Sequence, residues 1–291
     1  NAAQRYLYRV KLNGKGKLQR LSPKNLAGTH SYKISEDGKY AIHTYSSFDN
    51  PPVISLINLP KHKNIRALAP NTKTIENVNA LKKKPVEFFR LEIEEGVELD
   101  GWMLKPHDFD PAKKYPVLFY VYGEPAGQTV LDRFSRNYVW YNMLTNMGYI
   151  IMSVDNRGTP APRGRDWRKC VYKKIGSMTS EDQAKAVRKI IEWNFIDPDR
   201  IGIWGWSGGG SMTLNALFRY PELYKMGMSV APVPDQRLYD TIYQERYCGN
   251  PNIDSLSYKE GSPITYAQNL EGNLLLLHGT GDDNVHYQGT E

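Results

Sequence analysis

The sequence has little cysteine, no long apolar run and no signal-peptide pattern in its first residues. Its only cysteines, Cys170 and Cys248, exclude a disulfide framework and a cysteine-rich zinc site, and they could pair only if the fold brought them together. No run of about 18 apolar residues is present, so we expect no membrane span. The first residues lack an apolar signal-peptide core and an initiator methionine, so we expect a fragment or a processed form.

The net positive charge also says little about the partners of this protein. The formal net charge is +7, and much of it comes from residues 61–84, a run typical of a solvated surface. No recognition motif accompanies this charge, so we do not expect nucleic acid as a partner. Apolar residues make up 40% of the chain and aromatic residues 12%, which is enough for a packed core and argues against disorder.

The most informative stretch is residues 205–209, which read Gly-Trp-Ser-Gly-Gly. Residues 201–204 before it are apolar and β-branched, as in a buried strand, and residues 211–218 after it predict a helix. A Gly-x-Ser-x-Gly turn between a strand and a helix is the nucleophile elbow of α/β-hydrolases. We therefore expect Ser207 to be a nucleophile and the Gly208 N–H to bind a developing oxyanion. The alternative is a glycine-rich turn with a bystander serine.

Residues 1–70 are predicted to be all-β. The strands are expected at 6–12, 18–21, 31–34, 40–45 and 53–59. Such strands are the content of one or two β-propeller blades, and one blade cannot bury its own faces. We therefore expect the C-terminal part of a propeller whose other blades precede residue 1. The alternative is a small independent β-domain.

Residues 71–84 predict a polar linker with a short helix, and a different pattern covers residues 85–291. Strands are expected at 86–93, 97–104, 116–122, 149–154, 201–204, 226–230 and 273–277, and helices at 138–146, 180–193 and 211–218. Apolar strands alternating with helices predict a doubly wound, mostly parallel sheet. Ligand sites then lie beyond the carboxyl ends of the strands, where Ser207 is placed.

A serine nucleophile in this fold needs an acid that follows it in the chain. The loop after the strand at 273–277 offers Asp282 or Asp283, although an Asx turn would explain either one. Glu181 and Asp182 precede Ser207, and we interpret them as charges in the first turn of a helix.

The base should be a histidine after the acid. Only His286 follows Asp282, and it lies four residues on in the same loop, which favours a structural role. We therefore expect the base beyond Glu291. His30, His43, His62 and His107 show no metal-like spacing, and no metal or organic cofactor is expected.

A second oxyanion donor should come from the loop after the strand ending at Tyr122, whose hydroxyl is available to donate. The alternative for Tyr122 is a core aromatic residue at a strand end.

Five stretches in order carry a family resemblance: residues 120–125, 204–210, 230–233, 239–247 and 278–286. Together they resemble the dipeptidyl peptidase IV branch of the prolyl oligopeptidase family, which places a β-propeller before an α/β-hydrolase domain. The resemblance implies Ser207 as nucleophile, Asp282 as triad acid and the Tyr122 hydroxyl as oxyanion donor. It further implies a proline pocket lined by Tyr239 and Tyr243, a substrate carbonyl bound by Asn284, and apolar walls from Val233 and Val285.

This chain departs from the family pattern in two places. The family often has an aromatic residue after the serine, where this chain has Gly208, which changes the pocket wall but keeps the backbone donor. The paired glutamates that bind the substrate amino terminus in the family belong to propeller sequence before Asn1.

The resulting prediction is a serine peptidase that releases dipeptides after proline through an acyl-enzyme. The alternatives are another prolyl oligopeptidase-type peptidase, an esterase of the same fold, or a hydrolase-like binding protein that has lost catalysis. The resemblance favours a periplasmic or secreted location and is compatible with a homodimer.

Overall fold

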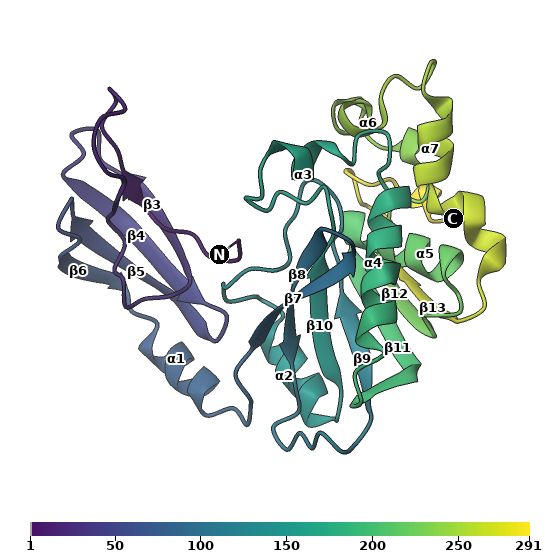
Figure 1. Ribbon diagram of the computed structural model, residues 1–291, viewed down its shortest axis with the longest axis horizontal. Helices are drawn as coiled ribbons and strands as arrows, with labels where there is room; N and C mark the ends of the chain where they lie inside the picture. The colour runs from purple at the N-terminus through teal and green to yellow at the C-terminus, as the bar shows by residue number, and fades with distance from the viewer. Residues whose placement is uncertain (1) are drawn as a thin grey trace. The chain divides into compact units, whose positions relative to one another are not determined.

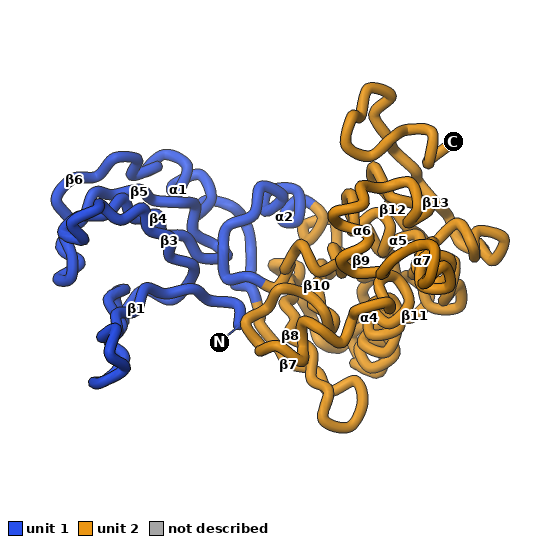
Figure 2. The backbone as a smooth tube through the Cα atoms, turned by 90° about the horizontal axis from the view of Figure 1, so that it is seen from above, with its two compact units in different colours: residues 1–86, 131–143 blue, residues 87–130, 144–291 orange. Residues whose placement is uncertain are grey.

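The computed structural model describes residues 2–291, which form two compact units. Of the described residues, the first unit comprises 2–86 and 131–143, and the second comprises 87–130 and 144–291 (Figure 2). The division into a propeller part ending at residue 70 and a hydrolase domain beginning at residue 85 stays a prediction.

The first unit is built on one four-stranded antiparallel sheet in the order β3-β4-β5-β6. Its strands are β3 (Thr29–Ile34), β4 (Tyr40–Ser47), β5 (Asn50–Asn58) and β6 (Asn64–Ala69), followed by helix α1 (Thr72–Asn79). A four-stranded sheet of this kind is the content of one propeller blade. The short strands β1 (Tyr8–Arg9) and β2 (Gln19–Arg20) pair separately.

One expectation for this unit is corrected, and two of its features were not expected. The strand expected at 6–12 pairs only over two residues. Strand β6 was not predicted, because five of its six residues are exposed and give no alternation of apolar and polar positions. The sequence also does not predict that residues 131–143 join this unit. Asp132 makes that connection in part, since its carboxylate accepts hydrogen bonds from Gln4 and from the Phe48 N–H, both at 2.9 Å.

The second unit contains a seven-stranded sheet in the order β13-β12-β11-β9-β10-β8-β7 (Figure 1). Its strands are β7 (Glu87–Glu94), β8 (Val97–Leu104), β9 (Tyr115–Tyr120), β10 (Ile150–Asp155), β11 (Ile196–Trp206), β12 (Met226–Val230) and β13 (Asn273–Leu277). β9 to β13 run parallel, and β7 and β8 form an antiparallel hairpin at one edge. Every residue of β10 is buried, as expected for a strand covered on both faces.

Helices flank this sheet or follow the carboxyl ends of its strands. Those of the second unit are α3 (Arg165–Lys169), α4 (Ser177–Ile190), α5 (Gly208–Arg219), α6 (Thr241–Cys248) and α7 (Ser255–Gly261), with 3-10 turns η1 (Gln236–Leu238), η2 (Pro263–Asn269) and η3 (Tyr287–Gly289). Helix α2 (Tyr138–Asn146) begins in the first unit and ends in the second. α4 and α5 pack side by side on the sheet (Figure 1). Side chains such as Val187 and Leu217 join the strands in one core, and full burial of each stabilises the fold by about 1.5–3 kcal/mol.

Candidate active site

Ser207 lies between the end of β11 and the start of α5, with φ 58° and ψ −121°. A positive φ costs a serine on the order of 1–3 kcal/mol and persists only when the surroundings impose it. A Cβ on Gly205 would lie 2.4 Å from the carbonyl oxygen of Gly209, and one on Gly209 would lie 2.3 Å from that of Val121. Only glycine fits at these two positions, so strand and helix approach closely and Ser207 has the backbone geometry of a nucleophile elbow.

Hydrogen bonds align this elbow with the neighbouring strand ends. The Ser207 N–H donates to the Val230 carbonyl oxygen at 2.8 Å, and the Ala231 N–H donates to the Leu277 carbonyl oxygen at 2.8 Å. The loop after β13 therefore begins at the same edge of the sheet as Ser207.

Asp282 lies in that loop and is half-buried, whereas Asp283 is exposed. Its Oδ1 accepts hydrogen bonds from the backbone N–H groups of Val285 (2.9 Å) and Asn284 (3.0 Å). These bonds hold the pKa of the Asp282 carboxyl below its ordinary value, so the group is an anion at neutral pH. The Nε2 atom of His278 lies 3.5 Å from Asp282 Oδ2. An oriented carboxylate of this kind suits the role of triad acid.

His286 is exposed, and among residues 2–291 no hydrogen bond joins it to Ser207 or to Asp282. It immediately precedes η3 without a capping hydrogen bond from its side chain, and its structural role stays a prediction.

Tyr122 follows β9, and its side chain lies close to that of Ser207. Burial, with the nearby groups of Glu124 and Tyr239, outweighs the lowering effect of Ser207 and raises the pKa of Tyr122 to about 12. The phenol therefore stays protonated and can donate. The absence of a side chain at Gly127 makes room for the ring, because a Cβ there would lie 2.5 Å from Tyr122 Cδ1.

The residues expected around the substrate gather in the same unit. The rings of Tyr239 and Tyr243 meet edge to face with centroids 5.7 Å apart, and the Tyr239 hydroxyl donates to Asn284 Oδ1 at 3.3 Å. Val233 and Val285 are buried. Tyr239, Tyr243 and Asn284 are therefore brought together from segments 40 residues or more apart in the chain, by the ends of β12 and β13.

Glu124 was not predicted as a site residue, and the only signal was a carboxylate within the motif at 120–125. It is buried, with 7% of its surface exposed, and its Oε2 accepts a hydrogen bond from the Tyr243 hydroxyl at 2.8 Å. A Cβ on Gly208 would lie 2.6 Å from this same oxygen. Burial, only partly offset by the Tyr243 bond, raises the pKa of Glu124 to about 7.

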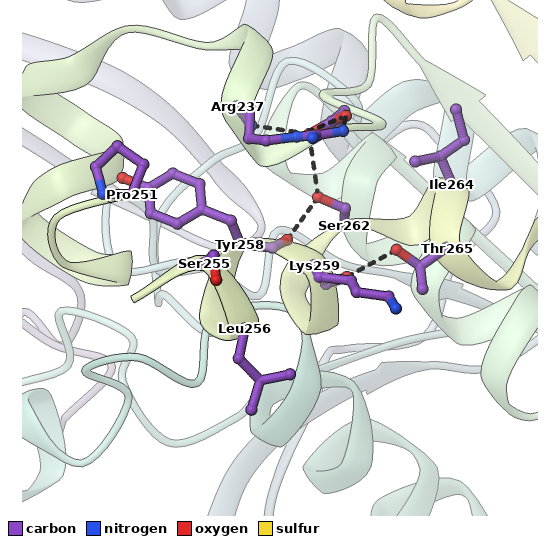
Figure 3. A pocket seen from close by; sticks show the side chains of 10 residues that line it. Arg237, Pro251, Ser255, Leu256, Tyr258, Lys259, Ser262, Ile264 and Thr265 are labelled. Carbon is purple, nitrogen blue, oxygen red and sulfur yellow. Dashed lines mark hydrogen bonds and ion pairs between the residues drawn. The ribbon is translucent and has the colours of Figure 1, made fainter. Parts of the chain in front are cut away.

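A network behind Tyr239 fixes the segment that carries it. The Gln236 N–H donates to Ser262 Oγ at 2.8 Å, and Ser262 Oγ in turn donates to the Tyr258 carbonyl oxygen at 2.7 Å. The Arg237 guanidinium donates a hydrogen bond to the Asp235 carboxylate at 2.5 Å. Asp235, Arg237, Tyr258 and Ser262 are among the residues that line a surface cavity of about 530 Å³ (Figure 3). Its Ser262 thus helps to support η1 and, through it, the position of Tyr239.

The acidic residues that precede Ser207 are placed away from catalysis. Asp182 lies in the second turn of α4, not the first as expected, because the helix begins at Ser177. It is fully buried and binds Arg157 in a bidentate ion pair at 2.7 and 3.0 Å. Glu181 pairs with Lys185 at 2.8 Å.

Cys170 and Cys248 are both free. Within residues 2–291 no group of three histidine, cysteine or carboxylate side chains could hold a metal ion. In the same range, no helix has the length and apolar character needed to cross a bilayer.

Comparison with known families matches both parts of the chain. Residues 134–291 match the prolyl oligopeptidase family, and residues 1–52 match the dipeptidyl peptidase IV (DPP IV) N-terminal region.

Individual relatives agree with these matches. The chain is 38% identical to a Talaromyces marneffei protein named "Probable dipeptidyl-aminopeptidase B", over 99% of this chain and 32% of that protein. It is 35% identical to dipeptidyl peptidase 4 of Arthroderma otae, over 91% of this chain and 34% of that protein. The crystal structure of Porphyromonas gingivalis dipeptidyl peptidase 4 superimposes with a TM-score of 0.92 at 40% identity, over 99% of this chain and 40% of that one. The chain thus spans about a third of the length of these curated relatives.

Proposed function

Because the chain belongs to the prolyl oligopeptidase family, we propose that it carries the nucleophile of a serine peptidase that releases dipeptides from peptide amino termini through an acyl-enzyme. The observation that supports this most directly is the strained Ser207, whose side chain lies close to the Tyr122 phenol at the carboxyl edge of the sheet. A strained serine next to a protonated phenol combines a nucleophile with an oxyanion donor.

In the proposed reaction the Ser207 oxygen attacks the scissile carbonyl and loses its proton to a histidine base, which the Asp282 carboxylate orients. The carbonyl oxygen becomes an anion in the tetrahedral intermediate. The Tyr122 hydroxyl and the N–H of Gly208, in the first turn of α5, donate to that anion. Water then hydrolyses the acyl-enzyme and restores Ser207.

The penultimate substrate residue is proposed to be proline, bound against the faces of Tyr239 and Tyr243. Aromatic rings suit a flat apolar pyrrolidine ring. Val233 and Val285 would complete the apolar wall, and Asn284 would donate its amide to a substrate carbonyl near the scissile bond.

Covalent labelling of the full-length protein tests the nucleophile. A fluorophosphonate probe is expected to label the wild type, and Ser207→Ala should abolish labelling. Ser255→Ala, which changes an exposed serine of α7, should keep it. Undiminished labelling of Ser207→Ala would contradict the proposal that Ser207 is the nucleophile.

Two chromogenic substrates separate the alternatives. A peptidase of the proposed type hydrolyses Gly-Pro-p-nitroanilide, whereas an esterase would turn over p-nitrophenyl acyl esters only. A binding protein without catalysis would turn over neither. A homodimer is a separate proposal from family resemblance, tested by light scattering of the full-length protein.

A further inference from the structure

The proposed substrate pocket beside Ser207 includes a buried carboxylate. Glu124 lies two residues after Tyr122, and its Oε2 accepts the Tyr243 hydroxyl at 2.8 Å. Burial raises the pKa values of Tyr122, Tyr243 and Cys248, and the Glu124 charge adds to each of these rises. It therefore lies among the side chains that would surround the penultimate residue of a substrate.

Gly208 makes room for this carboxylate. A Cβ at position 208 would lie 2.6 Å from Glu124 Oε2 and 2.7 Å from its Cδ. Because Gly208 directly follows Ser207, any side chain there would compete with the Glu124 carboxylate for space. The carboxylate thus lies against Gly208, next to the nucleophile, where it would form part of the wall of the proposed substrate pocket.

A carboxylate in this position changes what the pocket can bind. A purely apolar ring would cover the carboxylate and add no partner to the Tyr243 hydroxyl, which is unfavourable for a charged group. A cationic side chain would form a charge-assisted hydrogen bond with it, which is stronger than a neutral one. The rings of Tyr239 and Tyr243 can add attraction for a cation at their faces.

We propose that Glu124 is a specificity-determining residue that lets this pocket accept a lysine-like cationic side chain at the penultimate position of the substrate, in addition to proline. The inference rests on the proposed peptidase function and names a further substrate class for it.

The balance between the two substrate classes should depend on pH. Burial raises the pKa of Glu124 to about 7, and the titratable side chains near it are the phenols of Tyr122 and Tyr243 and the thiol of Cys248, whose own pKa values are all raised. Glu124 is therefore the group among them that titrates near neutrality. The protonated acid tolerates proline, and the carboxylate formed above about pH 7 favours the cation.

The test compares kcat/KM of the full-length protein for Gly-Lys-, Gly-norleucine- and Gly-Pro-p-nitroanilide. Norleucine matches the lysine side chain in shape without the charge. We expect the wild type to prefer lysine over norleucine by about 10-fold or more. In Glu124→Gln the ratio should fall to near one. Each ratio is measured within one enzyme, so a general loss of activity cancels.

Glu245→Gln is the matched control, because it removes an exposed carboxylate of α6 and should leave the ratio unchanged. The wild-type Lys/Pro ratio should rise as pH increases through about 7, and that of Glu124→Gln should stay flat. A wild-type Lys/norleucine ratio near one, or one unchanged in Glu124→Gln, would overturn the inference while Gly-Pro hydrolysis and probe labelling still support the peptidase. Absence of both labelling and hydrolysis would overturn the peptidase and the inference together.

Discussion

At the scale of single residues, the Tyr122 hydroxyl has two properties that an oxyanion donor needs. It lies close to the Ser207 side chain, near where negative charge would develop in the proposed reaction. Its pKa is raised to about 12 by burial first and then by nearby Glu124 and Tyr239, so the proton is retained throughout the neutral range. Position and protonation state together distinguish it from an ordinary core tyrosine.

Tyr122→Phe should therefore lower kcat by about 10²–10³-fold with little change in KM, because the hydrogen bond from the Tyr122 hydroxyl to the substrate becomes strong only as the oxyanion forms. Steady-state kinetics on Gly-Pro-p-nitroanilide measures both constants. Tyr172→Phe, which alters an exposed tyrosine, is the control and should behave as the wild type. A wild-type kcat in Tyr122→Phe would remove this residue from the mechanism.

The glycines of the elbow act through space. Gly209→Ala would place a Cβ 2.3 Å from the Val121 carbonyl oxygen, which is backbone and cannot rotate away. We expect a loss of about 1–3 kcal/mol in the free energy of unfolding, together with loss of probe labelling at Ser207. Gly279→Ala is the control, since no atom lies within 4 Å of its Cβ position. Equal denaturation midpoints for the two variants would contradict this packing account.

At the scale of elements, a histidine cluster joins strands β3 and β4 to the turn before β6. His30 Nδ1 and His43 Nε2 lie 2.9 Å apart, and the Tyr32 hydroxyl lies 2.9 Å from His62 Nε2. Burial lowers the pKa of each of the three histidines, that of His43 to about 4, and Arg20 adds a further lowering at His30. The folded blade therefore holds these rings neutral.

This cluster predicts acid sensitivity. Above about pH 6.5 both the folded and unfolded states keep His43 neutral and its stabilising contribution is complete. As pH falls from 6.5 toward 4, His43 binds a proton in the unfolded chain but not in the folded blade, so the free energy of unfolding decreases. Thermal unfolding followed by circular dichroism should show a falling midpoint over this range. The fall should be shallower in His43→Gln, whereas His107→Gln, at an exposed position, should leave it unchanged. An identical fall in His43→Gln would rule out His43 as a source.

At the scale of the whole molecule, the comparisons confirm the predicted fold class: an α/β-hydrolase sheet preceded by a C-terminal part of a propeller. The strand order of the second unit explains the composition of its site. β11, β12 and β13 are adjacent and parallel, so Ser207, the segment leading to Tyr239 and the Asp282 loop all follow strand ends at one edge.

The sequence alone determined the features that depend on local pattern. Alternation and apolar runs located the sheet strands with buried faces, and the Gly-x-Ser-x-Gly spacing located Ser207, because a tight strand-to-helix turn requires glycine at fixed offsets. The tertiary structure alone decided features that depend on distant segments. Strand β6 is exposed and has no periodic signal, and Asp182 is buried in an ion pair with Arg157, 25 residues away in the chain. Glu124 resembles a surface carboxylate in the sequence, since nothing local reveals that Tyr243, 119 residues away, donates to it. Local periodicity records which face of an element is buried, but the partner of a buried charge is fixed only by the packing of the whole chain.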